Sequence, residues 1–321
     1  MRFPFITRRA EEPQESHRRY RRKGGGGKGS GKGASDNNVT VDFILGGSTG
    51  SSSRGSSSSV TIAGSSRSAT SYGSGGGKAS TIPSGQIFAG RIEGGGTRDQ
   101  VFGSSTYGSG YPGITGRGVA GRGFPFLFWP IVWGGAAGIG STAYLHDTEY
   151  GSPDNTSRPG GPLMTSVFVS SASTSSNSTL SPTTFHILAD NTTLISLISA
   201  ITTNCSSNIN TSSSSSNTSN PSPYNASDPN APQPESAIGY YRASSVVLTL
   251  NGYNNSAALS SDENATNTPL PTGIDTTLED CLNQTIGAAV PLIDGARSIN
   301  TGVGSVALLS MLFVVLQRLV V

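Results

Sequence analysis

Apolar and polar residues alternate in three short runs of the C-terminal half. These runs contain Val167 and Val169, then Phe185 and Ile187, then Val246, Leu248 and Leu250. In a strand, alternate side chains point to opposite faces, so a period of two is typical of a strand with one buried face. The pattern therefore predicts three strands.

Two other stretches have the spacing of amphipathic helices. The first follows Asp190, with apolar residues three and four apart at Leu194, Leu197, Ile198 and Ile201. Asp190 is a suitable N-cap, because its carboxylate can accept hydrogen bonds from free backbone N–H groups of the first turn. The second stripe contains Leu278, Cys281, Leu282 and Thr285. Pro234 and Glu235 predict the start of a third, short helix that runs to about Arg242.

These elements predict a small α+β domain over residues 164–288, with an antiparallel sheet and two or three helices on one face. Residues 206–233 are rich in Ser, Asn and Pro, and we expect them to form a disordered insert. Residues 146–163 read as a polar connector before the domain, and residues 289–302 as a spacer after it.

The first 123 residues predict a disordered, basic, Gly/Ser-rich arm. The chain has 43 glycines among 321 residues and only 12% charged residues, so little apolar side chain is available to offset the entropy of ordering. Residues 17–23 read HRRYRRK before a glycine run, and like charges at this density repel. A strand-like run at residues 39–45 interrupts the arm without an evident partner.

An uncharged apolar segment, FPFLFWPIVWGGAAGIGSTAYL, occupies residues 124–145. As a helix it is long enough to cross a hydrocarbon core of about 30 Å, and Trp129 and Trp133 suit a membrane interface. Pro125 and Pro130 weaken its first turns. We predict a candidate transmembrane segment, with an apolar packing segment as the alternative.

A second apolar segment, VGSVALLSMLFVVLQRLVV, covers residues 303–321. An apolar tail after a polar spacer and small residues is similar to a GPI-attachment signal, for which Asp294 is the candidate lipid-attachment residue. Arg318 is unfavourable in such a tail, and the spacer is short. A helix that stays in the membrane is therefore the alternative, and a core helix of a soluble protein is the weaker third reading.

Charge differs in sign between the two parts of the chain. Residues before Phe124 contain 17 Lys and Arg and 7 Asp and Glu, a net of +10, whereas the rest contain 4 and 12, a net of −8. The positive-inside rule then places the basic part in the cytosol and residues 146–302 in the lumen or outside. Residues 1–6 start like a signal peptide but meet Arg8 and Arg9 without an apolar core. Either residues 124–145 act as a signal-anchor or a signal peptide is missing from the gene model, which would make the arm extracellular.

Asparagine acceptor motifs and cysteines support the same compartment. The motif Asn-x-Ser/Thr occurs eleven times, and all but Asn38 come after the apolar segment. The acceptor asparagines are Asn38, Asn155, Asn177, Asn191, Asn204, Asn210, Asn217, Asn225, Asn254, Asn264 and Asn283. Each motif is weak singly, but together they predict N-glycosylation. Cys205 and Cys281 form an even pair, which predicts one disulfide in an oxidising compartment. Two buried thiols are the alternative.

The Gly/Ser repetition also produces motifs that lack the required context. Residues 26–33 resemble a phosphate loop without its Ser or Thr, and residues 108–113 match G-x-G-x-x-G but contain a proline. Residues 46–50 match a nucleophile elbow without a triad in order. A polar connector explains the possible cation ligands His146, Asp147, Glu149 and Asp154. We therefore expect no catalytic residue, no cofactor and no metal, and predict that the chain is not an enzyme.

The string RGFPFLFWPIVWGG from Arg122, with AYLHDTEYGSPDNTSRPGGP ending at Pro162, resembles an uncharacterised family of fungal, basidiomycete-type proteins that carry a domain of unknown function. The strings FHILADNTTLISLISAI and YYRASSVVLTLNGYNNS are similar to the same family, so the resemblance covers about residues 120–290. It implies a membrane or cell-surface protein with a Gly/Ser-rich arm and an apolar C-terminus, and it transfers no activity. The N-terminus departs from the family pattern, which implies a signal peptide there.

The sequence thus predicts a membrane-anchored, N-glycosylated surface or secretory-pathway protein with a structural or interaction role. Its expected partners are membrane lipid and cell-wall or other surface components, and no small-molecule substrate is evident. The alternative is a nucleic-acid-associated protein that acts through residues 17–33, since Lys and Arg attract phosphate without any fold. Tyr20 is the only aromatic residue in that cluster, so base stacking has little support and nucleic acid is the less favoured partner.

Overall fold

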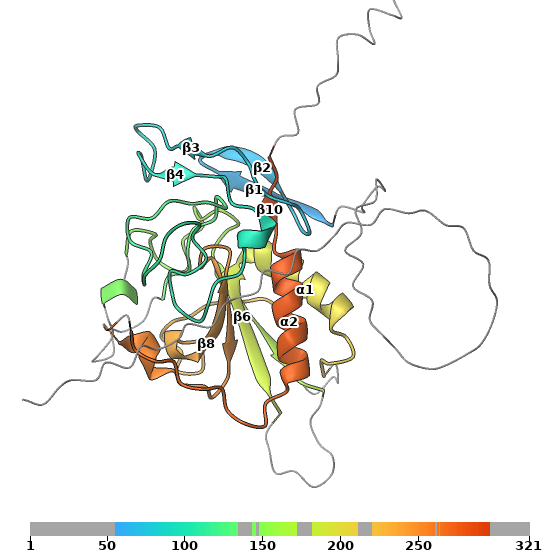
Figure 1. Cartoon of the computed structure of the whole chain (residues 1–321). Coiled ribbons are helices and arrows are strands. Elements are labelled where there is room, and N and C mark those ends of the chain that lie inside the picture. Colours follow the sequence, from blue (N-terminus) through green and yellow to red (C-terminus); the bar gives the residue numbers. More distant parts are fainter. Residues whose placement is uncertain are drawn as a thin grey trace, which may run out of the picture. The chain divides into compact units, whose positions relative to one another are not determined.

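The computed structural model describes residues 55–133, 143–145, 148–171, 182–210, 220–260, 262 and 264–295. Its largest element is a five-stranded antiparallel sheet with the order β7-β5-β6-β9-β8 (Figure 1). The strands are β5 (Leu163–Val169), β6 (Thr184–Asp190), β7 (Ser222–Pro223), β8 (Ala237–Tyr241) and β9 (Val246–Leu250). Two helices accompany them, α1 (Asn191–Asn204) and α2 (Thr276–Ala289). The α+β domain with an antiparallel sheet is confirmed.

Strand β6, helix α1 and strand β8 form a split β-α-β unit, with the short edge strand β7 between α1 and β8 in the chain. Strand β9 pairs antiparallel with both β6 and β8, so β6 and β8 run parallel with β9 between them. Strand β5 precedes β6 in the chain and pairs with its other edge. Helix α1 therefore crosses the sheet and packs beside α2 (Figure 1).

Both helices begin at aspartate N-caps. Asp190 accepts a hydrogen bond from the Thr193 backbone N–H at 2.9 Å, as the sequence predicted. Asp275 does the same for α2, accepting from Thr277 and Leu278 N–H at 3.0 Å. The predicted apolar stripes lie on the buried faces: Leu194, Leu197 and Ile201 are buried on α1, and Leu278, Leu282 and Thr285 on α2. The predicted members Ile198 and Cys281 are half-buried, and Ile286 adds to the buried face of α2.

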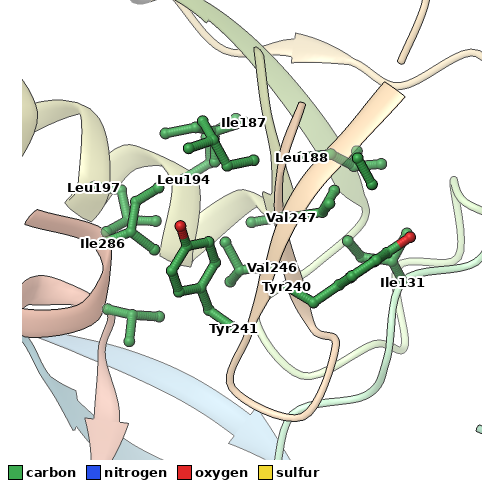
Figure 2. Packing of buried hydrophobic residues seen from close by; sticks show 14 of the residues in the cluster. Ile131, Ile187, Leu188, Leu194, Leu197, Tyr240, Tyr241, Val246, Val247 and Ile286 are labelled. Carbon is green, nitrogen blue, oxygen red and sulfur yellow. The ribbon is translucent and has the colours of Figure 1, made fainter. Parts of the chain in front are cut away.

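The sheet buries both faces. On one side, Ile187 and Val246 pack towards Leu194, Leu197 and Ile286 of the helices (Figure 2). On the other side, Leu188, Val247 and Tyr240 face Ile131, which lies in an irregular segment (Figure 2). Two buried faces explain why the residues of β9 are all apolar or small and all buried.

The prediction of a third helix from Pro234 to about Arg242 is wrong. A single 3-10 turn, η3 (Pro234–Ser236), is followed by strand β8. The reason is long-range pairing: β8 bonds to β9, and its bulky Tyr240 and Tyr241 are buried on opposite faces of the sheet. Proline is suited to the first turn of both an α-helix and a 3-10 turn, so Pro234 could not distinguish a longer helix from a single turn.

The prediction of a disordered arm up to residue 123 is wrong from residue 55 onwards. Strands β1 (Ser57–Ile62) and β2 (Ser65–Thr70) form a hairpin that β10 (Leu292–Ile293) joins, and β3 (Ser80–Thr81) pairs with β4 (Ile92–Glu93). Residues 100–133 form the irregular layer over the second sheet face. Several of the sparse apolar residues of this stretch are buried, among them Val60, Val101, Tyr107, Tyr111 and Val119.

Glycine makes these turns possible rather than signalling disorder. At Gly108, φ is +93° and an added Cβ would overlap the backbone of Gly118, so no other residue fits there without displacement. The strand-like run at residues 39–45 and the rest of the basic arm lie outside the described residues.

The prediction of a membrane-spanning helix over residues 124–145 is wrong for its described part. Residues 124–133 contain no helix, and Phe124, Phe126, Phe128 and Ile131 are buried in the domain. Pro125 and Pro130 break helical hydrogen bonding in this stretch. Within the described part of the chain, no helix is both long and apolar enough to cross a bilayer. The alternative of an apolar packing segment accounts for residues 124–133, whereas residues 134–142 lie outside the description.

The domain is also wider than predicted. Within the expected insert, β7 pairs with β5, and Tyr224 is buried with its hydroxyl donating to the Pro232 carbonyl at 3.1 Å. The expected polar connector buries Tyr150 and Arg158. Described residues of the folded domain therefore run from 55 to 295. Residues 211–219 and the tail at 303–321 lie outside the described residues.

Candidate functional site

A disulfide joins the two helices. Cys205 is the C-cap of α1, Cys281 lies on α2, and the two form a disulfide with their Cα atoms 5.9 Å apart. The predicted pairing is confirmed. Cys205 is fully buried, and its Sγ lies 3.5 Å from the Thr285 hydroxyl. The bond closes a loop with a sequence separation of 76 residues, so it restricts the unfolded chain considerably.

Four predicted glycosylation asparagines are exposed on the folded domain. They are Asn204, Asn225, Asn254 and Asn264. All four lie at the end of a helix or in loops, where a bulky glycan can extend into solvent. Asn38, Asn177 and Asn217 lie outside the described residues.

The other four, Asn155, Asn191, Asn210 and Asn283, are half-buried. Asn283 lies on α2, where its Oδ1 accepts a hydrogen bond from the Tyr241 hydroxyl at 2.7 Å. At the Asn191 motif, the Thr193 hydroxyl is fully buried and accepts from Arg242 at 2.9 Å. A glycan at Asn283 would require the folded contacts there to open, which separates this site from the exposed four.

The lipid-attachment candidate Asp294 belongs to the folded domain. Its Oδ1 accepts a hydrogen bond from the Gly75 N–H at 2.8 Å, and its backbone forms an isolated bridge with Gly76. Residues 296–321, which hold the rest of the predicted attachment signal, lie outside the described residues. Attachment at Asp294 stays a prediction.

An aromatic cavity of about 530 Å³ lies between the β1–β2 turn, the loop at 82–88 and the loops at 124–129 and 156–159. Such a volume lies within the range of small-ligand sites. We use the name aromatic cavity for the space lined by Thr61, Ile62, Ala63, Gly64, Ile82, Gly85, Gln86, Ile87, Phe88, Glu93, Phe124, Leu127, Trp129, Thr156, Ser157, Arg158 and Pro159. Phe88 and Trp129 meet edge to face with centroids 5.0 Å apart, so the rings form a fixed apolar wall beside hydroxyl, amide and carboxylate groups.

Two guanidinium groups support this wall and bond to protein groups, although the buried Nε of Arg158 has no hydrogen-bond partner among the described residues. Arg91 lies 4.7 Å from the Phe88 ring centroid and pairs with Glu149, whose hydrogen bond raises the pKa of Arg91. Buried Arg158 donates to the Trp129 carbonyl at 3.2 Å, and burial lowers its pKa to about 10. The cavity wall holds Arg158 and Glu93 together, so the lining has no excess of either charge.

Three residues of the cavity wall have left-handed backbone conformations, Ala63 (φ 47°), Phe88 (φ 66°) and Leu127 (φ 70°). For bulky residues such as Phe and Leu this conformation is uncommon and costs about 1–3 kcal/mol each. The Leu127 N–H donates to the Phe124 carbonyl at 2.8 Å, and the Phe88 carbonyl accepts from the Arg91 N–H at 3.1 Å. These bonds hold the turns that direct the two side chains into the wall.

Arg242 forms a second buried polar cluster beneath the turn between β8 and β9. It pairs with Asp190 at 2.7 Å, and its guanidinium lies 3.5 Å from the Phe128 ring centroid. Burial lowers the pKa of Arg242. Arg242, Ala243 and Ser244 all have positive φ. This cluster joins the turn to the start of α1, so its role is structural.

The predictions against catalysis and metal binding stay predictions. Glu149 pairs with Arg91, whereas His146 and Asp147 lie outside the described residues. Among the residues with described side chains, no group of three or more His, Cys, Asp or Glu could hold a metal ion. Of the three motifs from the Gly/Ser repetition, residues 26–33 and 46–50 also lie outside the described residues, whereas residues 108–113 are described.

Sequence reasoning missed the aromatic cavity because its wall comes from segments assigned to a disordered arm, a membrane span and a connector. The run FPFLFW was the available signal, since it places Phe124, Leu127 and Trp129 close together. The partners from residues 61–88 have no comparable local pattern.

Comparisons with protein-family models, with curated proteins and with solved structures each gave no match.

Proposed function

We propose that this chain is a non-enzymatic, N-glycosylated protein of the secretory pathway, held at a membrane or cell surface, with a structural or interaction role. The observation that carries the proposal is the combination of exposed acceptor asparagines with a disulfide inside one folded domain. Disulfides persist in oxidising compartments, and glycans are added to surface asparagines of secreted chains.

The ionisable groups with perturbed pKa values support a role without catalysis. Burial raises the pKa of Tyr107 and Tyr240 and lowers that of Arg242. These groups are bound to the protein itself: the Tyr107 hydroxyl donates to the Ile131 carbonyl, and the Tyr240 hydroxyl accepts from the Trp133 ring N–H at 3.1 Å. A catalytic group needs access to a reacting atom, and these side chains are in the core.

Anchoring in this proposal depends on the C-terminal segment, since residues 124–133 are part of the core. Residues 303–321 would either be exchanged for a lipid at Asp294 or remain as a membrane helix. The bridge between Asp294 and Gly76 would then place the end of the folded domain next to the anchor.

The aromatic cavity is the candidate interaction site. Its rings offer an apolar surface, and Thr61, Gln86 and Ser157 supply polar groups at the same wall. Because both Nη atoms of Arg158 donate to backbone carbonyls and the lining also contains Glu93, the lining favours a neutral ligand with one apolar face. Components of a cell wall or of another surface are the partners we infer.

Gel mobility with and without endoglycosidase tests the proposal on the full chain expressed in a glycosylating host. We expect a shift in the parent and the loss of one glycan step in each of Asn225→Gln, Asn254→Gln and Asn264→Gln. Asn283→Gln is the matched control, and we expect no step to disappear, since a folded chain with a glycan on half-buried Asn283 of α2 would lose its contact with Tyr241 of β8.

An unshifted parent would remove the secretory-pathway proposal and leave the nucleic-acid-associated alternative of the basic arm. Loss of a step in the Asn283 variant, with none lost at the three loop sites, would show that exposure in this fold does not determine modification.

A further inference from the structure

The acceptor motif Asn204-Cys205-Ser206 ends helix α1 next to an exposed tyrosine. Asn204 is exposed, and its Nδ2 donates to the Tyr72 hydroxyl at 3.0 Å. N-glycosylation forms a bond at this same nitrogen. A sugar on Asn204 would therefore start within contact distance of the Tyr72 ring.

Tyr72 forms one side of an open groove of about 670 Å³. We name it the Tyr72 groove, and it is lined by Tyr72, Gly73, Ser74, Gly75, Thr97, Arg98, Asp99, Phe102, Gln284, Gly287 and Ala288. Tyr72 and Phe102 are each 49% exposed, although aromatic side chains of this size are usually covered. Two half-exposed rings at one groove form an apolar surface that nothing in the described residues covers.

Both rings are held in place by the backbone around them. Phe102 lies against Gly287 of α2, where an added Cβ would overlap its ring, and makes an edge contact with Tyr241 at 5.8 Å. Tyr72 has φ +60°, which is uncommon for an aromatic residue. It lies against Gly55, where an added Cβ would approach the Tyr72 ring to 2.6 Å. The rings are thus positioned before any ligand arrives, which lowers the entropy cost of binding.

The polar lining of the groove suits a sugar. A pyranose ring has an apolar C–H face that can lie on an aromatic ring, and hydroxyl groups around its edge that need hydrogen-bond partners. Thr97, Asp99 and Gln284 supply such partners in the groove wall. Arg98 donates to the Gly73, Gly287 and Val290 carbonyls, and its Nη2 has no hydrogen-bond partner among the described residues.

We propose that Asn204 carries an N-linked glycan and that its first sugars fold back into the Tyr72 groove. The donor is a lipid-linked oligosaccharyl diphosphate: a bond forms between Nδ2 and the anomeric carbon, the bond from that carbon to the diphosphate breaks, and one Nδ2 proton is lost. The remaining Nδ2 proton still allows the bond to Tyr72. The glycan covers both exposed rings, and the inference rests on the secretory-pathway function proposed above.

The middle residue of the motif sets the order of events. Cys205 is fully buried and bonded to Cys281 in the folded domain, so the motif cannot be extended for transfer after the disulfide has formed. Glycan transfer to Asn204 therefore precedes formation of the disulfide, and the sugar is present when the groove folds around it.

Site-resolved deglycosylation of the native full chain tests the proposal. A peptide N-glycosidase converts each released asparagine to aspartate, which mass spectrometry reads at Asn204 and, as the internal reference, at Asn225. We expect release at Asn204 to be about two- to tenfold slower than at Asn225, from the strength of one or two ring contacts. After denaturation the two rates become equal.

Substitutions test whether the slower glycan release at Asn204 depends on the Tyr72 groove. Tyr72→Ala makes the two native rates equal, Tyr72→Phe keeps most of the difference, and Ile114→Ala, a change at another exposed apolar residue, leaves it unchanged. If Tyr72→Ala does not fold, Phe102→Ala gives the same test from the other side of the groove.

The possible failures are distinguishable. A chain without any glycan refutes the proposed function and this inference together. Glycan on Asn225 but none on Asn204, or equal native release at both sites in the parent chain, refutes the Tyr72 groove as a glycan site and leaves the proposed function standing.

Discussion

Replacing Arg242 with Met removes one of the largest fully buried side chains among the described residues. In the native structure its Nη2 donates to the Asp190 carboxylate at 2.7 Å, and its Nη1 donates to the Pro291 carbonyl at 3.0 Å. Its Nε donates to the Ser245 hydroxyl at 2.7 Å. Met has a similar length and no charge, so the change removes these bonds while filling most of the volume.

The expected loss of stability follows from the groups that Arg242→Met leaves without a partner. Asp190 keeps the N-cap bond from the Thr193 N–H but loses its cation, and an unpaired buried charge costs about 3–5 kcal/mol. The lost contact between the guanidinium and the Phe128 ring, at 3.5 Å, adds up to about 2 kcal/mol in a desolvated site. Since the two terms overlap, we expect a decrease of about 4–5 kcal/mol in the free energy of unfolding.

A double-mutant cycle with Asp190→Asn isolates the ion pair. Asp190→Asn leaves the buried guanidinium unpaired and should cost a similar amount, whereas the double variant contains neither charge. We expect the double variant to lose about 2–3 kcal/mol less than the sum of the single variants.

Urea unfolding of the disulfide-intact full chain measures these values, with an unchanged m-value as evidence that the two end states are the same. Arg67→Met is the matched control, since Arg67 is exposed on β2, and its effect should stay within about 0.5 kcal/mol. A cost below about 1 kcal/mol for Arg242→Met, or strict additivity in the cycle, would refute the assigned role of the pair.

Three further predictions concern the disulfide, pH and the domain limits. Replacing Cys205 and Cys281 with Ser should lower the free energy of unfolding by about 4 kcal/mol. A change below about 1 kcal/mol in urea would contradict a stabilising role of the disulfide. Burial lowers the pKa of His186, so as pH drops through about 6.5 the unfolded chain takes up the His186 proton first and stability falls. The melting temperature should therefore fall less between pH 7.5 and 5.5 in His186→Gln than in the parent chain. Equal falls in the two chains would argue against this role of His186. A chain that starts at residue 55 should give a native near-ultraviolet dichroism spectrum, whereas one that starts at residue 124 should not; a native spectrum from the shorter chain would mean that residues 55–123 are not part of the core.

The two helices and three strands could be located because each has a periodic pattern of its own, but the expectation of one buried face per strand is wrong: β9 is buried on both faces, and β5 buries Phe168 rather than Val167 and Val169. Leu194, Leu197 and Ile201 lie on one face of α1 by spacing alone, and Asp190 is a recognisable cap. The disulfide followed from the cysteine count and the expected compartment. These features depend on neighbours close in the sequence.

The parts that could not be predicted depend on partners far along the chain. Strand β8 has no period that separates it from a helix, and pairing with β9 determines its form. Val60, in the run SSSVTI, and Val101, in the run RDQVFG, have few apolar neighbours in the sequence, so their burial appears only when the rest of the domain is present.

The aromatic run at 124–133 shows the same limit from the other direction. Its hydrophobicity is equally compatible with lipid and with a protein core, because both exclude water. The presence of an open sheet face at Leu188 and Val247 determines the outcome. The acceptor motifs were visible in the sequence, but their exposure depends on the fold, and the groove beside Asn204 depends on the packing of α1 against Ser71 and Tyr72.

The claim that residues 55–295 form a glycosylated domain of the secretory pathway is tested most directly by mass spectrometry of the full chain from a glycosylating host, digested without reduction. We expect glycans on Asn225, Asn254 and Asn264, together with a linked peptide pair that contains Cys205 and Cys281. Unmodified asparagine at all three sites, with both cysteines as free thiols, would contradict it.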